Sequence, residues 1–125
     1  MKTATPGRRA ERVAERIKTE LMALLLRGAV RDPGAQDGLI TQVVVSDDLS
    51  HARVYVRLLR EEADEPAQKR LISALSRAAG FLRRELAGRI ELKHQPELRF
   101  FWDDGLDRAA RVEQLLAEIE REGRQ

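Results

Sequence analysis

The spacing of apolar residues changes twice along this chain, and this constrains the fold more than any other feature. Residues 10–26 repeat apolar side chains at intervals of three and four, which is typical of an amphipathic helix. Residues 40–58 carry β-branched and alternating apolar side chains, which predict strands. Helical spacing returns after residue 64. A chain of 125 residues that mixes both periods predicts a single α+β domain.

The two predicted strands form a hairpin with a turn at residues 47–50. The first strand is apolar at nearly every position from Ile40 to Val45, which we interpret as a central strand. The second alternates apolar residues with Arg53, Tyr55 and Arg57. This alternation predicts an edge strand with arginines on its exposed side.

The next segment predicts a helix interrupted by a glycine. Asp64 can cap its start, and Pro66 fits the first turn because proline's missing N–H is not needed there. The apolar face continues past Gly80 as far as Gly88. Glycine within a helix costs about 1 kcal/mol relative to alanine. Either the helix tolerates Gly80, or the chain bends there.

A third strand and a last helix complete the predicted order. Residues 97–102 form a short strand, residues 103–107 a polar turn and residues 108–122 an amphipathic helix. Because the helix pair must cross the sheet to reach the third strand, the helices are expected on one face of a three-stranded sheet. We expect residues 8–122 to form the domain, and residues 1–7 and 123–125 to be flexible termini.

Composition excludes several classes of protein. The chain has no cysteine, which removes disulfides, thiolate metal sites and thiol nucleophiles and fits a reducing compartment. Two histidines alone cannot supply a zinc site. There is no apolar run of about 18 residues and no apolar stretch near the N-terminus typical of a secretory signal. These features favour a soluble, cytoplasmic protein. We also expect a monomer without cofactor, metal, membrane partner or small-molecule substrate.

Basic residues are concentrated in two segments. Residues 1–31 hold eight basic residues against three acidic ones, and residues 77–99 hold six against three. The acidic stretch 61–65 lies between them. Such an uneven distribution favours an anionic partner, although a charge run is more often a solvated helix face. The predicted phosphate ligands on the first helix are Arg8, Arg9, Arg12 and Arg16.

The segment 77–84 combines positive charge with missing side chains. Two alanines and a glycine would let a nucleic-acid backbone approach closely, and a helix that begins at Gly80 or Phe81 would point N–H groups at a phosphate. The alternative is a glycine without any binding role. The predicted contact residues are Arg77, Ala78, Ala79, Gly80, Arg83 and Arg84.

The candidates for catalysis have simpler interpretations. The pairs at residues 47–48 and 103–104 stand where turns and helix caps favour aspartate. Ser46 and His51 lie on opposite sides of a tight turn without an evident pocket. We therefore predict no enzymatic activity. The aromatic residues 100–102 either stack bases or pack beneath the helices.

Four segments of the chain resemble the ribosome-binding factor A family: RVAERIKTEL, VVVSDDLSHARVYV, SRAAGFLRRELAGRIELKHQPELRFFWDDG and VEQLLAEI. The resemblance runs from about Arg8 to Glu122 and implies a type II KH-like fold. It implies that the first strand is central and that the third runs parallel beside it. The family's Ala-x-Gly bend corresponds to residues 78–80, whereas the loop of residues 31–38 is expected to differ from the family.

The resemblance also implies a function without catalysis. It implies a factor that binds the 30S small ribosomal subunit and its 16S rRNA near the decoding region and assists late 30S maturation and rRNA processing. In KH modules the bend clamps a short single-stranded backbone. The alternative is a protein interaction module that uses the acidic and basic surface patches.

Overall fold

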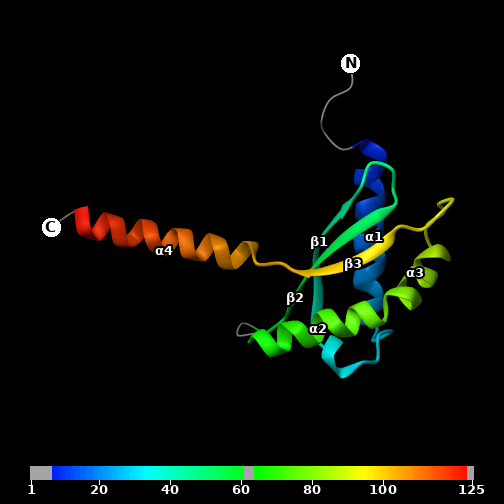
Figure 1. The fold of residues 1–125 in the computed structure, drawn as a ribbon, viewed down its shortest axis with the longest axis horizontal. Helices are drawn as coiled ribbons and strands as arrows, with labels where there is room; N and C mark the ends of the chain where they lie inside the picture. Colours follow the sequence, from blue (N-terminus) through cyan, green and yellow to red (C-terminus); the bar gives the residue numbers. More distant parts are fainter. Residues whose placement is uncertain (1–6, 61–63, 124–125) are drawn as a thin grey trace, which may run out of the picture.

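Three α-helices and a three-stranded sheet form two layers in this computed structural model, and a fourth helix extends away from them (Figure 1). The structure describes residues 7–60 and 64–123, but not the side chains of residues 106–111. The predicted α+β order is confirmed. The elements are α1 (Arg8–Leu26), the short 3-10 helix η1 (Pro33–Ala35), β1 (Gly38–Val45), β2 (His51–Leu58), α2 (Glu65–Arg77), α3 (Ala79–Ala87), β3 (Glu97–Trp102) and α4 (Gly105–Gly123).

The sheet has the order β1-β2-β3, with β1 antiparallel and β3 parallel to β2. The prediction of a central first strand with the third strand beside it is therefore wrong, and so is that of an edge second strand. Alternation in β2 shows that one face of the sheet is open, and it does not distinguish a central strand from an edge strand. A register shift between Ile40 and Gln42 divides β1, and its apolar residues alternate between buried positions and the half-buried Leu39 and Val44.

The hydrophobic core lies between one face of the sheet and helices α1, α2 and α3, as predicted. Alternate residues of β2 and β3 point into this layer, and each helix contributes one apolar stripe. Full burial of a large aliphatic side chain contributes about 1.5–3 kcal/mol, so these stripes fix how the helices lie on the sheet. The residues at its centre include Ile17, Leu21, Val54, Val56, Leu71, Leu75, Leu82 and Leu86.

Aspartates close the turns and caps, as the sequence indicated. The Asp64 carboxylate accepts a hydrogen bond from Ala67 N at 2.9 Å and caps α2. In the hairpin turn, Asp48 accepts from the hydroxyls of Ser46 and Ser50 at 2.8 and 2.6 Å. The Ser50 hydroxyl, the Ser46 hydroxyl and then the Ser50 N–H lower the pKa of Asp48 to about 2. The carboxylates of Asp48 and Asp64 therefore hold a turn and a helix start in place.

Asp103 connects the sheet to α4. One of its carboxylate oxygens accepts from the Thr41 hydroxyl at 2.6 Å, and the other accepts from Gly105 N at 2.9 Å. Helix α4 consequently begins at Gly105, three residues before the predicted start. It runs away from the domain (Figure 1). Beyond residue 111, its large apolar side chains are more than half exposed, namely Val112, Leu115, Leu116 and Ile119.

Some expectations fall partly outside the described residues. The predicted flexible ends correspond largely to residues 1–6 and 124–125, and most of the acidic stretch to residues 61–63. Within the ranges that the structure covers, no helix has the length and apolar character needed to span a membrane.

Candidate nucleic-acid interface

Helices α2 and α3 are separated by a bend at Ala78. This residue has φ −86° and ψ −2°, and α3 begins at Ala79. The predicted bend is therefore present, two residues before Gly80. None of the described side chains caps the start of α3. The first N–H groups of a helix have no partner within it and lie at the positive end of its dipole, so this turn suits an anion.

Gly80 is not needed for the geometry of the bend. Its φ is not positive, unlike that of Gly28 at the end of α1. A Cβ atom added to Gly80 would meet only Arg84 Nη1, at 3.7 Å, which is an ordinary contact. The glycine instead leaves an exposed surface without a side chain beside the first turn of α3.

The three arginines predicted at the bend differ in their partners. Arg77 forms an ion pair with Asp32, with Nη2 and Oδ2 2.5 Å apart. Arg83 donates two hydrogen bonds to the Gln95 carbonyl, at 3.1 and 2.6 Å. Arg84 is exposed and has no ion pair or hydrogen bond with any described residue. Of these three arginines, Arg84 alone has its guanidinium without a partner among the described residues, whereas Asp32 offsets the charge of Arg77.

Asp32 belongs to the loop that was expected to differ from the family. Its carboxylate also accepts from Gly34 N at 2.9 Å, which caps η1. The hydrogen bond from Arg77, followed by that from Gly34 N, lowers the pKa of Asp32. The loop therefore supplies a carboxylate that already pairs with Arg77, one of the predicted phosphate ligands.

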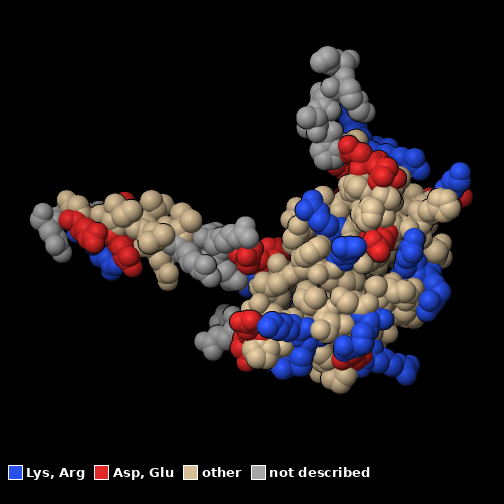
Figure 2. Space-filling view, viewed as in Figure 1, with Lys and Arg blue, Asp and Glu red and all other residues tan. Residues whose placement is uncertain are grey.

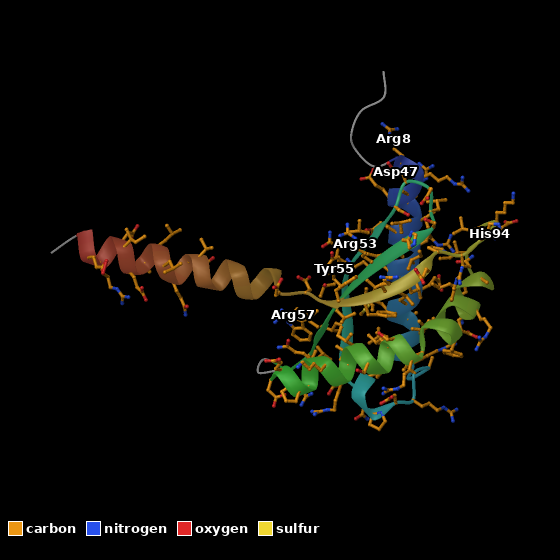
Figure 3. The ribbon with its side chains drawn as sticks, in the orientation of Figure 1. Arg8, Asp47, Arg53, Tyr55, Arg57 and His94 are labelled. Carbon is orange, nitrogen blue, oxygen red and sulfur yellow. The ribbon has the colours of Figure 1, made fainter. Side chains whose placement is uncertain are left out.

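The four predicted arginines of α1 form one stripe on the helix. At 3.6 residues per turn they fall within about 100° of one another, opposite the buried stripe. Arg16 donates to the Arg89 carbonyl at 2.9 Å. Arg8 lies beside Asp47 of the hairpin turn (Figure 3), where Gly7 N donates to Asp47 at 3.2 Å. Apart from Arg8, the arginines of the stripe line a groove of about 510 Å³ between α1 and the segment that follows α3. The groove is lined by Arg9, Arg12 and Arg16 on one side and by Ile90, Glu91 and Leu92 on the other.

The ten predicted residues do not form one cluster. The bend lies at the start of α3, beside a groove of about 290 Å³ that Arg31 and Phe81 help to line. The α1 stripe meets the segment that follows the other end of α3. Helix α3 has nine residues, a length of about 13 Å. The structure thus places two basic groups near the two ends of this helix.

An ion-pair network that the sequence analysis missed joins α1 to α3. Arg89 contacts Glu85 at 2.8 Å and Glu20 at 3.4 Å, and Glu85 also contacts Arg27 at 3.6 Å. The available signal was the spacing of Glu85 and Arg89, which are four residues apart at the end of α3, with Arg89 just beyond its last residue. This network connects the helices that carry the two basic groups, whose positions depend mainly on the buried core.

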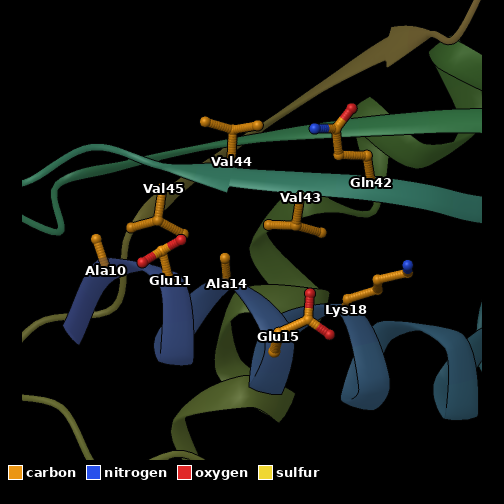
Figure 4. A pocket seen from close by; sticks show the side chains of 9 residues that line it. All are labelled: Ala10, Glu11, Ala14, Glu15, Lys18, Gln42, Val43, Val44 and Val45. Atoms are coloured by element: carbon orange, nitrogen blue, oxygen red, sulfur yellow. The ribbon is translucent and has the colours of Figure 1, made fainter. Parts of the chain in front are cut away.

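The other side of α1 has a different character. A groove of about 370 Å³ separates it from β1, and Figure 4 shows Glu11, Glu15 and Lys18 around it. Two carboxylates make this groove a poor site for phosphate. Figure 2 shows Lys and Arg spread over the compact part of the molecule, whereas acidic side chains predominate on α4. Charge therefore distinguishes the two sides of α1, and the core domain from α4.

The residues considered for catalysis have local roles. Ser46 donates to Asp48, and the His51 ring contacts the Ser50 hydroxyl at 2.8 Å and Glu97 at 3.6 Å. Ser46 and the His51 ring are thus not arranged as nucleophile and base. The described residues contain no group of three or more His, Asp or Glu side chains suited to a metal ion.

The aromatic residues of β3 divide between the two faces of the sheet. Phe100 is buried and Trp102 partly buried on the helix side, whereas Phe101 is exposed on the open side. Phe100 and Trp102 therefore pack beneath the helices, whereas base stacking stays a prediction for Phe101. The predicted strand order put β3 beside β1, so it did not place Phe101 next to Tyr55 of β2.

Comparison with known proteins gives a consistent result. The family model described as Ribosome-binding factor A matches residues 9–116. A ribosome-binding factor A from Synechococcus sp. (strain WH7803) is 43% identical over 119 residues, which cover 94% of this chain and 82% of that protein.

Solved structures agree with the sequence comparison. The crystal structure of ribosome-binding factor A from Thermus thermophilus has a TM-score of 0.63 and 29% identity, covering 74% of this chain and 93% of that one. A homology model of the Thermus thermophilus factor, fitted into a cryo-EM map of its complex with 30S, has a TM-score of 0.51 and 32% identity, covering 71% and 93%. The fold class is accordingly α+β and type II KH-like. By sequence and by structure, the chain belongs to the ribosome-binding factor A family.

Proposed function

We propose that this chain is a non-catalytic, cytoplasmic factor that binds the 30S small ribosomal subunit. It contacts 16S rRNA near the decoding region and assists late 30S maturation and rRNA processing. Membership of the ribosome-binding factor A family supports a ribosomal partner, and so does the similarity to a factor fitted into a map of a complex with 30S.

One observation carries the proposed RNA contact. The first turn of α3 is exposed at Gly80, has no side-chain cap among the described residues and lies next to Arg84. An RNA phosphate can reach the N–H groups there without meeting a side chain larger than methyl at residues 78–80. Arg77, Arg83 and the α1 stripe add positive charge on either side. The protein acts by holding an rRNA conformation until maturation proceeds.

The substitution Gly80→Leu tests this proposal directly. An added Cβ at this position meets only the flexible end of Arg84, so the fold should be retained. We expect weaker co-sedimentation with 30S subunits and an unchanged far-UV circular dichroism spectrum. Gly123→Leu is the matched control, because a Cβ there meets nothing within 4 Å and the residue lies at the end of α4. This control should bind like the wild type.

The charge at the bend supplies a second arm of the test. Arg84→Glu should weaken binding to 30S subunits, and the loss should shrink as salt rises because charged contacts are screened. If folded Gly80→Leu and Arg84→Glu proteins both co-sediment as strongly as the wild type, the bend is not the RNA contact.

A protein interaction module is the second candidate function. The exposed apolar stripe of α4 and its acidic side chains favour a protein contact there. Binding to 30S subunits that is insensitive to salt and survives Arg84→Glu, but is lost on Leu115→Glu, would support this candidate.

A further inference from the structure

We propose that the open face of the sheet is a second RNA-binding surface. It stacks bases of single-stranded RNA on Tyr55 and Phe101 and holds phosphates with Arg53 and Arg99. This surface lies on the side of the sheet away from α1, α2 and α3. The inference rests on the proposed function and adds to it a contact of a different chemistry.

Strand register places these four side chains in two adjacent rows. In the parallel pairing of β2 and β3, Tyr55 lies next to Phe101 and Arg53 next to Arg99. Their neighbours along the strands, such as Val54, point into the core, so all four residues face the open side. Figure 3 shows Arg53 and Tyr55 following one another along β2.

The aromatic row presents ring surface to solvent. The ring centroids of Tyr55 and Phe101 lie 5.7 Å apart at an interplanar angle of 33°. Phe101 is 40% exposed on the edge strand β3, although phenylalanine is among the residue types that are most often buried. Every base has an aromatic face that can stack on such rings, and exposed aromatics on neighbouring strands bind bases in other sheet-based RNA modules.

The arginine row supplies the charge. Two like charges side by side on neighbouring strands destabilise a sheet unless an anion lies between them. Arg53 makes only a long contact with the Tyr55 hydroxyl, at 3.4 Å, and Arg99 contacts Glu97 at 3.6 Å with 68% of its side chain exposed. Glu97 is also shared with His51. Neither arginine forms a short ion pair with a residue that the structure describes.

The spacing of the rows suits a nucleotide. Two residues along a strand span about 6.6 Å, so the arginines stand beside the rings rather than over them. A base on the rings would therefore leave its phosphate near the arginine row. Because α4 runs away from the domain, it leaves this face open (Figure 1).

Adjacent phenylalanines of β3 provide a matched test. Fluorescence anisotropy would measure the affinity of the full chain for a fluorescein-labelled oligouridylate. We expect Phe101→Leu to weaken binding about 5- to 150-fold, the range expected for the loss of one base–ring stack. Phe100→Leu makes the same change on the buried side of the strand. It should lower the unfolding midpoint and leave the affinity unchanged in the folded protein.

The arginines have a separate readout. Removing both charges with Arg53→Gln and Arg99→Gln should lower the slope of log K against log salt by about 1.4, because each phosphate contact to a single strand contributes about 0.7. Arg121→Gln on α4 removes charge elsewhere and should leave the slope unchanged.

Wild-type affinity for oligouridylate in folded Phe101→Leu protein would overturn the inference. The inference would also be overturned if Phe101→Leu changed amide exchange in α4 but left the affinity for RNA unchanged. In that case α4, and not RNA, would cover the open face of the sheet. If Gly80→Leu loses 30S binding while Phe101→Leu binds 30S and oligouridylate normally, only the inference fails. If the wild type binds neither 30S nor oligouridylate, the proposed function fails too.

Discussion

At the scale of single residues, the role of an arginine depends on its nearest partner. Arg77, Arg83 and Arg84 are close in sequence and were predicted to act alike. In the structure Arg77 pairs with Asp32, Arg83 holds the Gln95 carbonyl and Arg84 faces solvent. The charge available to an RNA therefore differs among them, although their residue type is the same.

Asp32→Asn should release Arg77 for binding. The amide can still accept from Gly34 N, but it cannot form the ion pair. We expect stronger binding to 30S subunits, measured by co-sedimentation at fixed salt. Glu118→Gln on α4 is the matched control, because it removes one negative charge elsewhere. Adding Arg77→Gln to Asp32→Asn should abolish the gain, and a gain that survives would show that Arg77 is not a ligand.

The ion pair of Asp32 should also make the stability of the folded protein depend on pH. The pKa of Asp32 is lowered in the folded protein, so its contribution to stability is present above the ordinary aspartate pKa. That contribution is lost as pH falls from about 4 through the lowered pKa. Urea denaturation should therefore show Asp32→Asn less stable than the wild type at pH 7, with a difference that shrinks in acid.

At the scale of elements, close packing explains the loop between α1 and β1. Its 3-10 helix lies close against α2. A Cβ added to Gly34 would stand only 2.9 Å from the Arg70 carbonyl oxygen, which is too close for an ordinary contact. A backbone atom cannot move aside as the end of a side chain can. Gly34 therefore lets the loop approach the helix, which the pattern of Pro and Gly alone did not reveal.

Two glycines in similar helical surroundings should respond differently to alanine. Gly34→Ala should cost about 1–3 kcal/mol in the free energy of unfolding, as overpacking does. Gly80→Ala has open space for its Cβ and should gain about 0.4–1 kcal/mol, because the unfolded chain loses freedom. Urea titration of both variants measures this contrast. Equal effects at the two positions would contradict the packing described for η1.

At the scale of the whole molecule, the helices of the core and α4 differ in how far they bury their described apolar side chains. Helices α1, α2 and α3 bury their apolar stripes on one face of the sheet, whereas α4 exposes its own. The stability of the domain should consequently depend on the first three helices. The exposed surfaces, α4 and the open sheet face, remain available for partners.

Leucine-to-alanine substitutions on two helices test this separation. Leu82 of α3 is 1% exposed, and Leu82→Ala should cost about 2–5 kcal/mol. Leu116 of α4 is 58% exposed, and Leu116→Ala should change the free energy of unfolding by less than about 0.5 kcal/mol. Urea denaturation followed by Trp102 fluorescence compares the two. A large cost for Leu116→Ala would mean that α4 packs on the domain in solution.

The sequence by itself determined the α+β class, the order of helices and strands, the hairpin turn and the cap at Asp64. These features follow from local spacing and local hydrogen bonds, which are readable over a few residues. It also located the bend to within two residues, because alanine and glycine limit side-chain bulk there. The resemblance to the family came from the same local segments.

Only the tertiary structure decided which strand is central, which arginines are paired and which aromatic faces solvent. Strand order depends on how β3 returns to the sheet, and alternation in β2 is compatible with either neighbour. Arg77 meets Asp32 across 45 residues of sequence, and Tyr55 meets Phe101 only because β3 pairs with β2. Contacts between residues so far apart are set by the packing of the whole domain, so they cannot be predicted from the spacing of residues within one segment.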